Sequence, residues 1–301
     1  SSLAQSFNPE RDRTLRLLFY NTENTFDTLN NPDTDDDEFT KESVRHWDSY
    51  KYYAKIKKLY KTFMATGGWQ PPEIIGLCEI ENKNILEDLV RNTPFNKYQY
   101  KIIHKNSPDK RGIDVAALYN PEKFELLRYK YFPVILPEPY RNTRDILYLK
   151  GTTKIKDTLH IFINHWPSKW KGNLRTEPKR IKAAKILRGK VDSLFKHDQN
   201  SKIIITGDFN DSPGAKSIQQ YLKAFPVEDT LKNDILYNLS SGWNNFYGTH
   251  KYQGKWAVID QFIVSSELIK QSGGNYCSTD DAFIFYKDFL LEEDEKYTGE
   301  K

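Results

Sequence analysis

The sequence predicts an α/β protein whose sheets are covered on their faces. Short apolar runs alternate with longer amphipathic segments along the 301 residues, with no internal repeat and no low-complexity linker. Strands that alternate with helices are typical of sheets packed against helices. Hydrophobic residues make up 38% of the chain, which is enough for a large core and too much for a disordered protein. No domain boundary is visible, so we expect one domain over residues 1–301.

Two amphipathic segments predict long helices. Residues 48–68 place their apolar side chains on one face and end at two glycines. Residues 176–196 carry Pro178 in the first turn, where a missing N–H group costs little. A shorter helix is expected over residues 83–92. The apolar runs predict strands over residues 14–21, 73–82, 112–120, 145–151, 159–166, 202–211 and 256–269.

Composition excludes several classes of protein. Lys and Arg number 45 against 41 Asp and Glu, and a formal charge of +4 permits an anionic substrate without the dense basic stripe of a dedicated nucleic-acid-binding protein. Two cysteines make neither a disulfide framework nor a zinc site. No apolar run is long enough to span a membrane. The chain begins "SSLAQSFNPE" without Met, as after removal of a secretion signal, so export stays open. A monomer is expected.

Polar residues that bind metals or move protons stand at the end of, or within, five predicted strands. They are Asn21, Glu79, His165, the pair Asp208 and Asn210, and Asp260. Each alone has an ordinary structural interpretation, since Asn is a common turn residue. Several such groups at strand ends, where clefts form in α/β folds, indicate one shared site. Asp260 in particular needs a partner, because burying a lone carboxylate costs several kcal/mol.

These residue types favour phosphoester chemistry with a hard cation. Carboxylate and amide oxygens without thiolates or several imidazoles suit Mg²⁺ or Mn²⁺ rather than Zn²⁺. Such a reaction needs a metal ligand, a base for water and donors to the phosphoryl oxygens. Glu79 fits the first role, Asp208 the second and His165 the third, with Asn21 and Asn210 as orienting amides. No G-x-S-x-G elbow and no P-loop motif occurs.

Three further residues are candidates for substrate binding. Arg111 and Arg144 flank strands and could hold a phosphate with two hydrogen bonds, although a solvated turn residue is an equally good interpretation. Trp170 lies in a basic loop and suits stacking on a base, and it equally suits an ordinary loop. Trp166 is expected to pack in the core beside the site.

The strand-end motifs resemble those of the endonuclease/exonuclease/phosphatase family. They occur in the family's order as "LLFYNTENTFD", "IIGLCEIEN", "GIDVAALYN", "FINHWPSKW", "ITGDFNDSP" and "WAVIDQFIVS". Within the family the chain is similar to the bacterial predicted extracellular nucleases, which share the "FYN-x-EN-x-FD" opening and "NHWPS". The resemblance implies a four-layer sandwich of two mixed β-sheets flanked by helices, which is the deoxyribonuclease-like fold. It also implies a divalent-metal-dependent phosphodiesterase, with a nuclease as the first expectation and nucleic acid or another phosphodiester as the substrate.

The resemblance also assigns roles to individual positions. It implies that Glu79 and Asn21 hold the metal, with Asn21 also near the phosphate, and that His165 contacts the scissile phosphate. Asp208 matches the water-activating Asp, and Asn210 its neighbouring Asn. Asp260 matches the Asp that orients the catalytic His of a last Ser-Asp-His motif.

That last motif is missing after Asp260. Residues 278–283 and 288–301 contain no His, and His250 precedes the strand on a polar turn. A shortened chain, a natural end at this point and a strand supplied from elsewhere are three explanations. The acidic ending favours the first, because exposed loops are common sites of nicking.

Three other functions remain open. The same chemistry could act on an inositol phosphate, a phospholipid head group or a phosphomonoester. A binding module that kept the fold and lost its last motif is a second alternative. A structural α/β protein with coincidental polar residues at its strand ends is the third.

Overall fold

The computed structural model describes residues 14–170, 172–243, 248–271 and 273–291. Two sheets dominate it, and both are mixed. The smaller contains β1 (Leu17–Thr25), β2 (Ile74–Ile80), β3 (Lys101–His104) and β4 (Asp114–Tyr119), in the order β1-β2-β4-β3. Only β1 and β2 run parallel in it, while β4 is antiparallel to β2 and to β3.

The larger sheet has the order β5-β6-β7-β8-β13-β10-β9. Its strands are β5 (Phe124–Phe132), β6 (Ile146–Thr153), β7 (Thr158–His165), β8 (Lys202–Asp208), β9 (Ala224–Phe225), β10 (Leu236–Asn238) and β13 (Asp260–Ser265). The parallel pair β7 and β8 lies at its centre, and β13 runs antiparallel to β8. A separate hairpin is formed by β11 (His250–Tyr252) and β12 (Lys255–Ala257).

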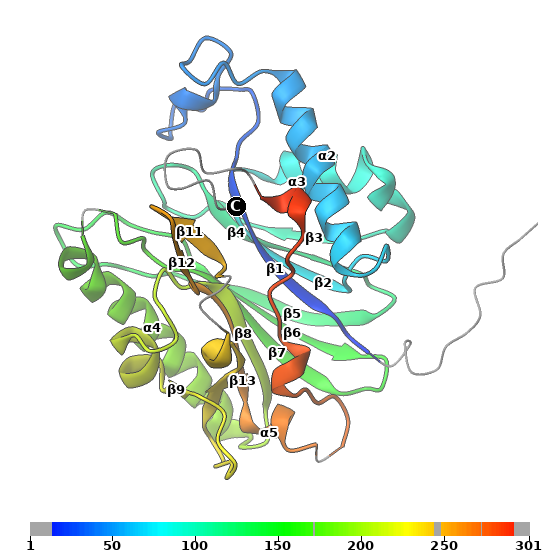
Figure 1. Ribbon diagram of the computed structural model, residues 1–301, viewed down its shortest axis with the longest axis vertical. Helices are drawn as coiled ribbons and strands as arrows, with labels where there is room; N and C mark the ends of the chain where they lie inside the picture. Colours follow the sequence, from blue (N-terminus) through cyan, green and yellow to red (C-terminus); the bar gives the residue numbers. More distant parts are fainter. Residues whose placement is uncertain (1–13, 171, 244–247, 272, 292–301) are drawn as a thin grey trace, which may run out of the picture.

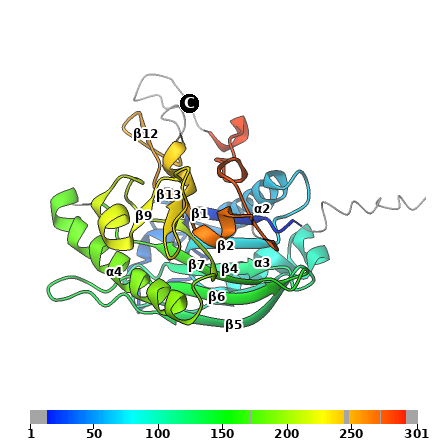
Figure 2. The same cartoon turned by 90° about the horizontal axis from the view of Figure 1, so that it is seen from below.

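Helices cover the outer faces of both sheets. Helices α2 (Ser49–Thr66) and α3 (Lys83–Arg91) lie beside the smaller sheet, and the long α4 (Asn173–His197) lies beside the larger one (Figure 1). The view turned by 90° keeps α4 on the opposite side from α2 and α3 (Figure 2). The remaining elements are the short helix α5 (Ser266–Ile269), the 3₁₀ turns η1 (Asp37–Phe39), η2 (Pro94–Tyr98), η4 (Leu239–Gly242), η5 (Thr279–Asp281) and η6 (Asp288–Leu290), and the π-helical turn η3 (Ser217–Leu222).

Alternation along the strands explains these layers. In β2, Ile75 and Leu77 pack with the helices α2 and α3, whereas Ile74 and Cys78 face the other sheet. The two sheets meet closely, since a Cβ atom at Gly76 would lie 3.1 Å from the Ile163 side chain of β7. Successive side chains of a strand point to opposite faces, so strands buried on both faces are apolar throughout. The predicted four-layer sandwich is confirmed.

One predicted element is wrong. The expected continuous strand over residues 256–269 is three elements, namely β12, β13 and α5. A tight turn at Gln253 and Gly254, both with positive φ, pairs β11 with β12, and the chain enters the large sheet only at Asp260. Asp260 is therefore the first residue of β13 rather than an interruption in the middle of a strand. In the described residues no helix is both long enough and apolar enough to cross a membrane.

Candidate active site

Two neighbouring bulges bring Asn21 and Glu79 together. The β1–β2 pairing shifts register after Asn21, and the β2–β4 pairing shifts at Glu79. Glu23, Asn24 and Glu79 all adopt left-handed backbone conformations, with φ of 53°, 57° and 63°. Such conformations cost non-glycine residues on the order of 1–3 kcal/mol each and persist only when the surroundings hold them. Here the Asn24 N–H donates to Glu79 Oε2 at 2.8 Å, and the Glu23 N–H donates to Asn21 Oδ1 at 2.9 Å.

The parallel strands β7 and β8 supply the opposite side of the site. They end together, with His165 in register with Asp208. Gly207 permits this approach, because a Cβ atom there would lie 2.2 Å from the Asn164 carbonyl oxygen, and its φ is 151°. The glycine of the "GDFN" motif is thus required by the close packing of two backbones.

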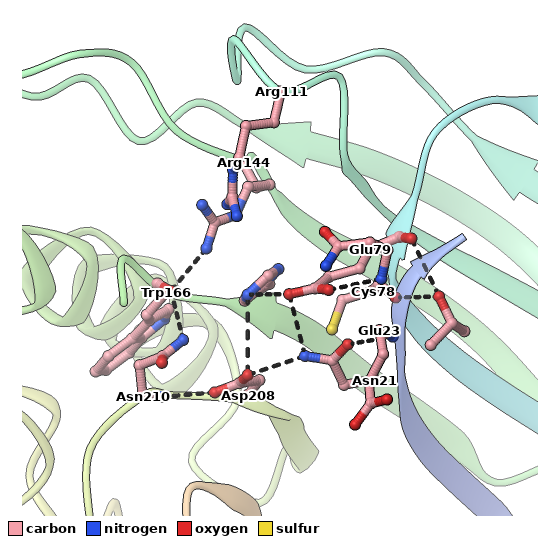
Figure 3. Close-up of polar contacts among 12 residues, drawn as sticks. Asn21, Glu23, Cys78, Glu79, Arg111, Arg144, Trp166, Asp208 and Asn210 are labelled. Carbon is pink, nitrogen blue, oxygen red and sulfur yellow. Dashed lines mark hydrogen bonds and ion pairs between the residues drawn. The ribbon is translucent and has the colours of Figure 1, made fainter. Parts of the chain in front are cut away.

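The side chains of Asn21, Glu79 and Asp208 converge on one point (Figure 3). The Asn21 amide donates to Asp208 Oδ2 at 3.1 Å and reaches Glu79 Oε1 at 3.4 Å. His165 Nε2 lies 3.7 Å from Glu79 Oε1 and 3.8 Å from Asp208 Oδ2. Asn21 and Asp208 are 187 residues apart in the sequence, yet the fold brings them within hydrogen-bonding distance.

Asn210 fixes the orientation of Asp208. Its backbone N–H donates to Asp208 Oδ1 at 2.8 Å, and its side-chain amide donates to the Trp166 carbonyl oxygen at 3.0 Å. Asn210 has a left-handed φ of 50°, which Asn tolerates better than most residues. The Trp166 indole is buried as expected and packs edge-on against Phe209.

Arg144 is a buried residue of the site rather than a solvated turn residue. Its Nη1 binds Asp109 at 2.9 Å, and its Nη2 donates to the Trp166 carbonyl oxygen at 2.7 Å. Arg111 binds the same Asp109 at 3.4 Å, with its side chain 47% exposed. Both arginines approach from the same side of the site (Figure 3). Burial acts to raise the pKa of Asp109, but Arg144 and Arg111 outweigh it and hold that pKa below its usual range.

Asp260 sits beside Asp208 in the antiparallel register of β13 and β8. Its backbone N–H donates to the Thr249 hydroxyl at 2.9 Å. Its Oδ1 is buried, and no residue of the described chain forms a hydrogen bond with that atom. His250, which precedes this strand in the sequence, pairs through the hairpin with Ala257 and has an exposed side chain.

The carboxylates repel one another in a dry environment. Burial raises the pKa of Asp208 to about 6, and the nearby Glu79 carboxylate adds to the rise. Burial and the charges of Asp208 and Glu79 raise the pKa of Asp260 well above its usual range. The His165 imidazole shifts in the opposite direction, because burial and the cations Arg144 and Arg111 lower its pKa. His165 is therefore neutral near pH 7 and carries one N–H donor.

The site can hold a hard cation better than a soft one. It offers the carboxylate oxygens of Glu79 and Asp208, which repel each other and would be stabilised by a cation between them, and the Asn21 amide presents its N–H group to both. The Cys78 thiol lies beside them (Figure 3), but burial raises its pKa, so it is not available as a thiolate. Among the described residues, no three His, Cys, Asp or Glu side chains already stand in positions from which they could hold a metal ion together.

Trp170 is not part of this convergence. It lies in the loop between β7 and α4, and its indole is 76% exposed. The other expected residues lie closer to it. Asn21, His165, Asn210 and Arg144 contact Glu79, Asp208 or the Trp166 carbonyl oxygen. Asp260 pairs with Asp208 on the neighbouring strand, and Arg111 binds the same Asp109 as Arg144.

Sequence reasoning missed two supporting carboxylates, Asp109 and Asp211. Asp211 is buried, and its Oδ2 accepts from Arg180 at 2.7 Å and from Ser217 at 2.6 Å. These bonds hold the turn that carries Asn210. A signal was present in the second acidic residue of "GDFND" and in an arginine on the apolar face of α4. For Asp109, in the loop before β4, the sequence carries no comparable signal.

Comparisons with known proteins bear on the family and the fold. A model of the endonuclease/exonuclease/phosphatase family matches residues 16–301. No curated protein matches the chain. Among solved structures, a humanized D. rerio TDP2 is 12% identical and has a TM-score of 0.55, covering 86% of each chain. The Bacteroides thetaiotaomicron mannosyl-6-phosphatase is 16% identical with a TM-score of 0.52, covering 84% of this chain and 85% of the other. At these identities the structures show a shared fold alone. The match over nearly the whole sequence establishes that the chain belongs to the endonuclease/exonuclease/phosphatase family.

Proposed function

We propose that the chain is a divalent-metal-dependent phosphodiesterase and that its substrate is a nucleic acid. Membership of a family of phosphoester hydrolases supports the reaction class. The single observation that carries the proposal is the meeting of Asp208 with Glu79, Asn21 and His165, at the bulges of β1 and β2 and the ends of β7 and β8. A solved D. rerio TDP2 with this fold is described in complex with a single-strand DNA product, which supports a nucleic-acid substrate here.

Asp208 acts as the general base. A carboxylate with a pKa of about 6 is largely ionised at pH 7 and still basic enough to take a proton from water. Asn210 and Asn21 hold its two oxygens, so the proton acceptor has a fixed orientation. The hydroxide formed attacks phosphorus in line with the departing oxygen.

The other side chains bind and orient the phosphate. The neutral His165 imidazole donates its one N–H to a phosphoryl oxygen, and a preorganised donor of this kind is worth about a hundredfold or more in rate. Arg144 and Arg111 set a positive potential on the same side. Asp260 Oδ1 lacks a partner among the described residues. This atom would accept a hydrogen bond from an imidazole N–H group or take up a proton.

Glu79 would hold the Mg²⁺ or Mn²⁺ ion, and Asn21 would join it through Oδ1 once its carboxamide turned, because its Nδ2 faces the Glu79 and Asp208 carboxylates in this structure. Bound there, the cation would neutralise charge on the phosphoryl oxygens and on the departing oxygen. The oxygen-rich donor set and the repulsion between Glu79 and Asp208 both fit this role.

Cleavage of bis-p-nitrophenyl phosphate and of supercoiled plasmid, each with Mg²⁺, with Mn²⁺ and with EDTA, tests the proposal. Metal-dependent cleavage of both is expected. Asp208→Asn should lower kcat by a factor on the order of 10²–10⁴, because the base is lost. Asp192→Asn, a change at a half-exposed position of α4, serves as the matched control and should keep full activity.

Each other outcome contradicts a stated part of the proposal. Cleavage of the small diester but not of plasmid would remove nucleic acid as the substrate. Turnover of p-nitrophenyl phosphate alone would point to a phosphatase, and full activity of Asp208→Asn would remove the assigned base.

A further inference from the structure

A basic pocket adjoins the site on the side of Glu79. It lies between the bulge of β1, the loop that follows β1 and the first turns of α2, and its volume is about 350 Å³. Its lining residues are Glu23, Asn24, Phe39, Arg45, Trp47, Lys51 and Lys55. Three cations face one carboxylate in this set, so the pocket carries an excess of positive charge.

The three cations retain hydrogen-bonding capacity. Lys51 Nζ donates to the Arg45 carbonyl oxygen at 2.7 Å, and Lys55 Nζ donates to the Glu23 carbonyl oxygen at 2.6 Å. An ammonium group has three donors and a guanidinium has five, so these contacts and the exposed pair of Arg45 with Glu38 leave N–H groups for a ligand. Burial lowers the pKa of Lys55 despite the opposing effect of Glu23 and Glu79, and neighbouring Arg45 adds to the fall. An anion bound in the pocket would offset the repulsion between Lys55 and Arg45.

Aromatic rings hold two of the cations, Arg45 and Lys55, in place. Phe39 stacks on Phe26 with ring centroids 4.0 Å apart, and the Trp47 indole N–H donates to the Phe26 carbonyl oxygen at 3.1 Å. The Arg45 guanidinium lies 5.0 Å from the Phe39 ring, and Lys55 Nζ lies 5.9 Å from the Trp47 ring. Contacts of this kind restrict long side chains before a ligand arrives, which reduces the entropy lost on binding.

The pocket and the catalytic carboxylates share the β1 bulge. Asn24 lines the pocket, and its backbone N–H binds Glu79 Oε2 at 2.8 Å. Glu23 lines the pocket as well, and its backbone N–H binds Asn21 Oδ1. Lys55 holds the carbonyl oxygens of both bulge residues. A group bound in the pocket is therefore a near neighbour of one bound at Glu79.

We propose that this pocket binds a second phosphate group of the substrate, next to the phosphate that is cleaved. The inference rests on the proposed phosphodiesterase activity and narrows its substrate to molecules with at least two phosphates. Such a phosphate can come from the neighbouring nucleotide of an oligonucleotide or from another position of a phosphorylated sugar or inositol ring. The shared chemistry is a phosphate held by ammonium and guanidinium donors.

Dinucleotides that differ by one phosphate provide the test. The ratio of kcat/KM for pTpT or TpTp to kcat/KM for TpT measures the contribution of the second phosphate. A ratio of about ten or more is expected for the wild type, because a hydrogen bond from a charged donor to a phosphate is stronger than one between neutral groups. A parallel series of diesters, in which an inositol ring carries a methyl phosphate with or without a second phosphate, distinguishes the two sources of the phosphate.

The variants Lys51→Gln and Arg45→Gln should bring this ratio close to one. Lys57→Gln, an exposed position of α2 outside the pocket, is the matched control and should leave the ratio unchanged. A wild-type ratio near one in both series would overturn the proposal. A ratio that survives both pocket substitutions would do the same.

Binding without catalysis separates this proposal from the proposed function. Calorimetric titration with inorganic pyrophosphate in EDTA needs no turnover. The affinity should fall about fivefold or more in Lys51→Gln and stay unchanged in Lys57→Gln. That result would support an anion pocket even if no diester were cleaved, whereas equal affinities in the wild type and Lys51→Gln would refute it.

Discussion

Replacing Arg180 by Met tests whether a buried ion pair holds the catalytic turn. The Arg180 side chain is fully buried, with 0% exposure, and its Nε binds Asp211 Oδ2 at 2.7 Å. Its other donors reach the Thr176 hydroxyl at 2.9 Å and the Pro167 carbonyl oxygen at 3.4 Å. The substitution would leave the Asp211 carboxylate buried beside an apolar side chain.

The magnitude follows from what remains around Asp211. Removing one partner of a buried pair costs about 3–5 kcal/mol, because the other charge is left uncompensated. Lys169 Nζ stays 3.1 Å from Asp211 Oδ1, but its side chain is 47% exposed and its charge is screened by water. The Ser217 hydroxyl still donates to Oδ2. We therefore expect a loss of about 3 kcal/mol, at the lower end of that range.

Urea unfolding followed by circular dichroism measures this loss. The double variant Arg180→Met with Asp211→Asn should recover at least about 1 kcal/mol, because the uncompensated charge is removed. Arg188→Met is the control on the same helix, since Arg188 forms an i,i+4 pair with a half-exposed Asp192 and should cost about 1 kcal/mol or less. A loss below 1 kcal/mol for Arg180→Met, or no recovery in the double variant, would refute the reasoning.

Three further predictions concern pH, backbone packing and phosphate binding. Burial lowers the pKa of His160 to about 4, so the unfolded chain takes up a proton before the folded chain does as the pH falls. The free energy of unfolding should therefore fall by about 2 kcal/mol between pH 6.5 and pH 4, after allowance for solvent screening. Urea titrations at several pH values measure this slope, and His160→Gln should flatten it. Gly207→Ala should cost about 2 kcal/mol or more in thermal unfolding, because the new Cβ meets the Asn164 carbonyl oxygen; an unchanged melting temperature would contradict the close approach. Arg144→Lys should lower kcat/KM on the small diester by roughly tenfold, because one ammonium group cannot make both guanidinium hydrogen bonds, to Asp109 and to the Trp166 carbonyl oxygen. A rate equal to that of the wild type would show that these two bonds are not needed together.

The sequence was informative where chemistry and strand ends coincide. His165 and Asp208 stand at the last positions of two adjacent parallel strands, so apolar runs that end in polar residues were enough to place them together. The bulges that aim Asn21 and Glu79 could not be foreseen in the same way. Glu23 and Glu79 adopt left-handed conformations although neither is Gly, and only the surrounding hydrogen bonds impose that geometry.

The wrong strand over residues 256–269 shows the limit of an apolar pattern. A run of apolar residues does not reveal where a chain leaves one sheet and enters another. Gly254 was a local sign of the hairpin, and Ser265 stands as the N-cap of α5, but both signs are weaker than the run itself. The supporting residues Asp109 and Thr249 were missed because their roles depend on tertiary contacts from distant loops.

One backbone oxygen has a wide influence on this molecule. The Trp166 carbonyl accepts from the Arg144 guanidinium and from the Asn210 amide, so the residue that orients the base and the buried cation share an anchor. A rotation of that single peptide plane would release both at once. A substitution that changes the backbone after β7 should therefore impair substrate binding and the chemical step together, rather than one of them alone.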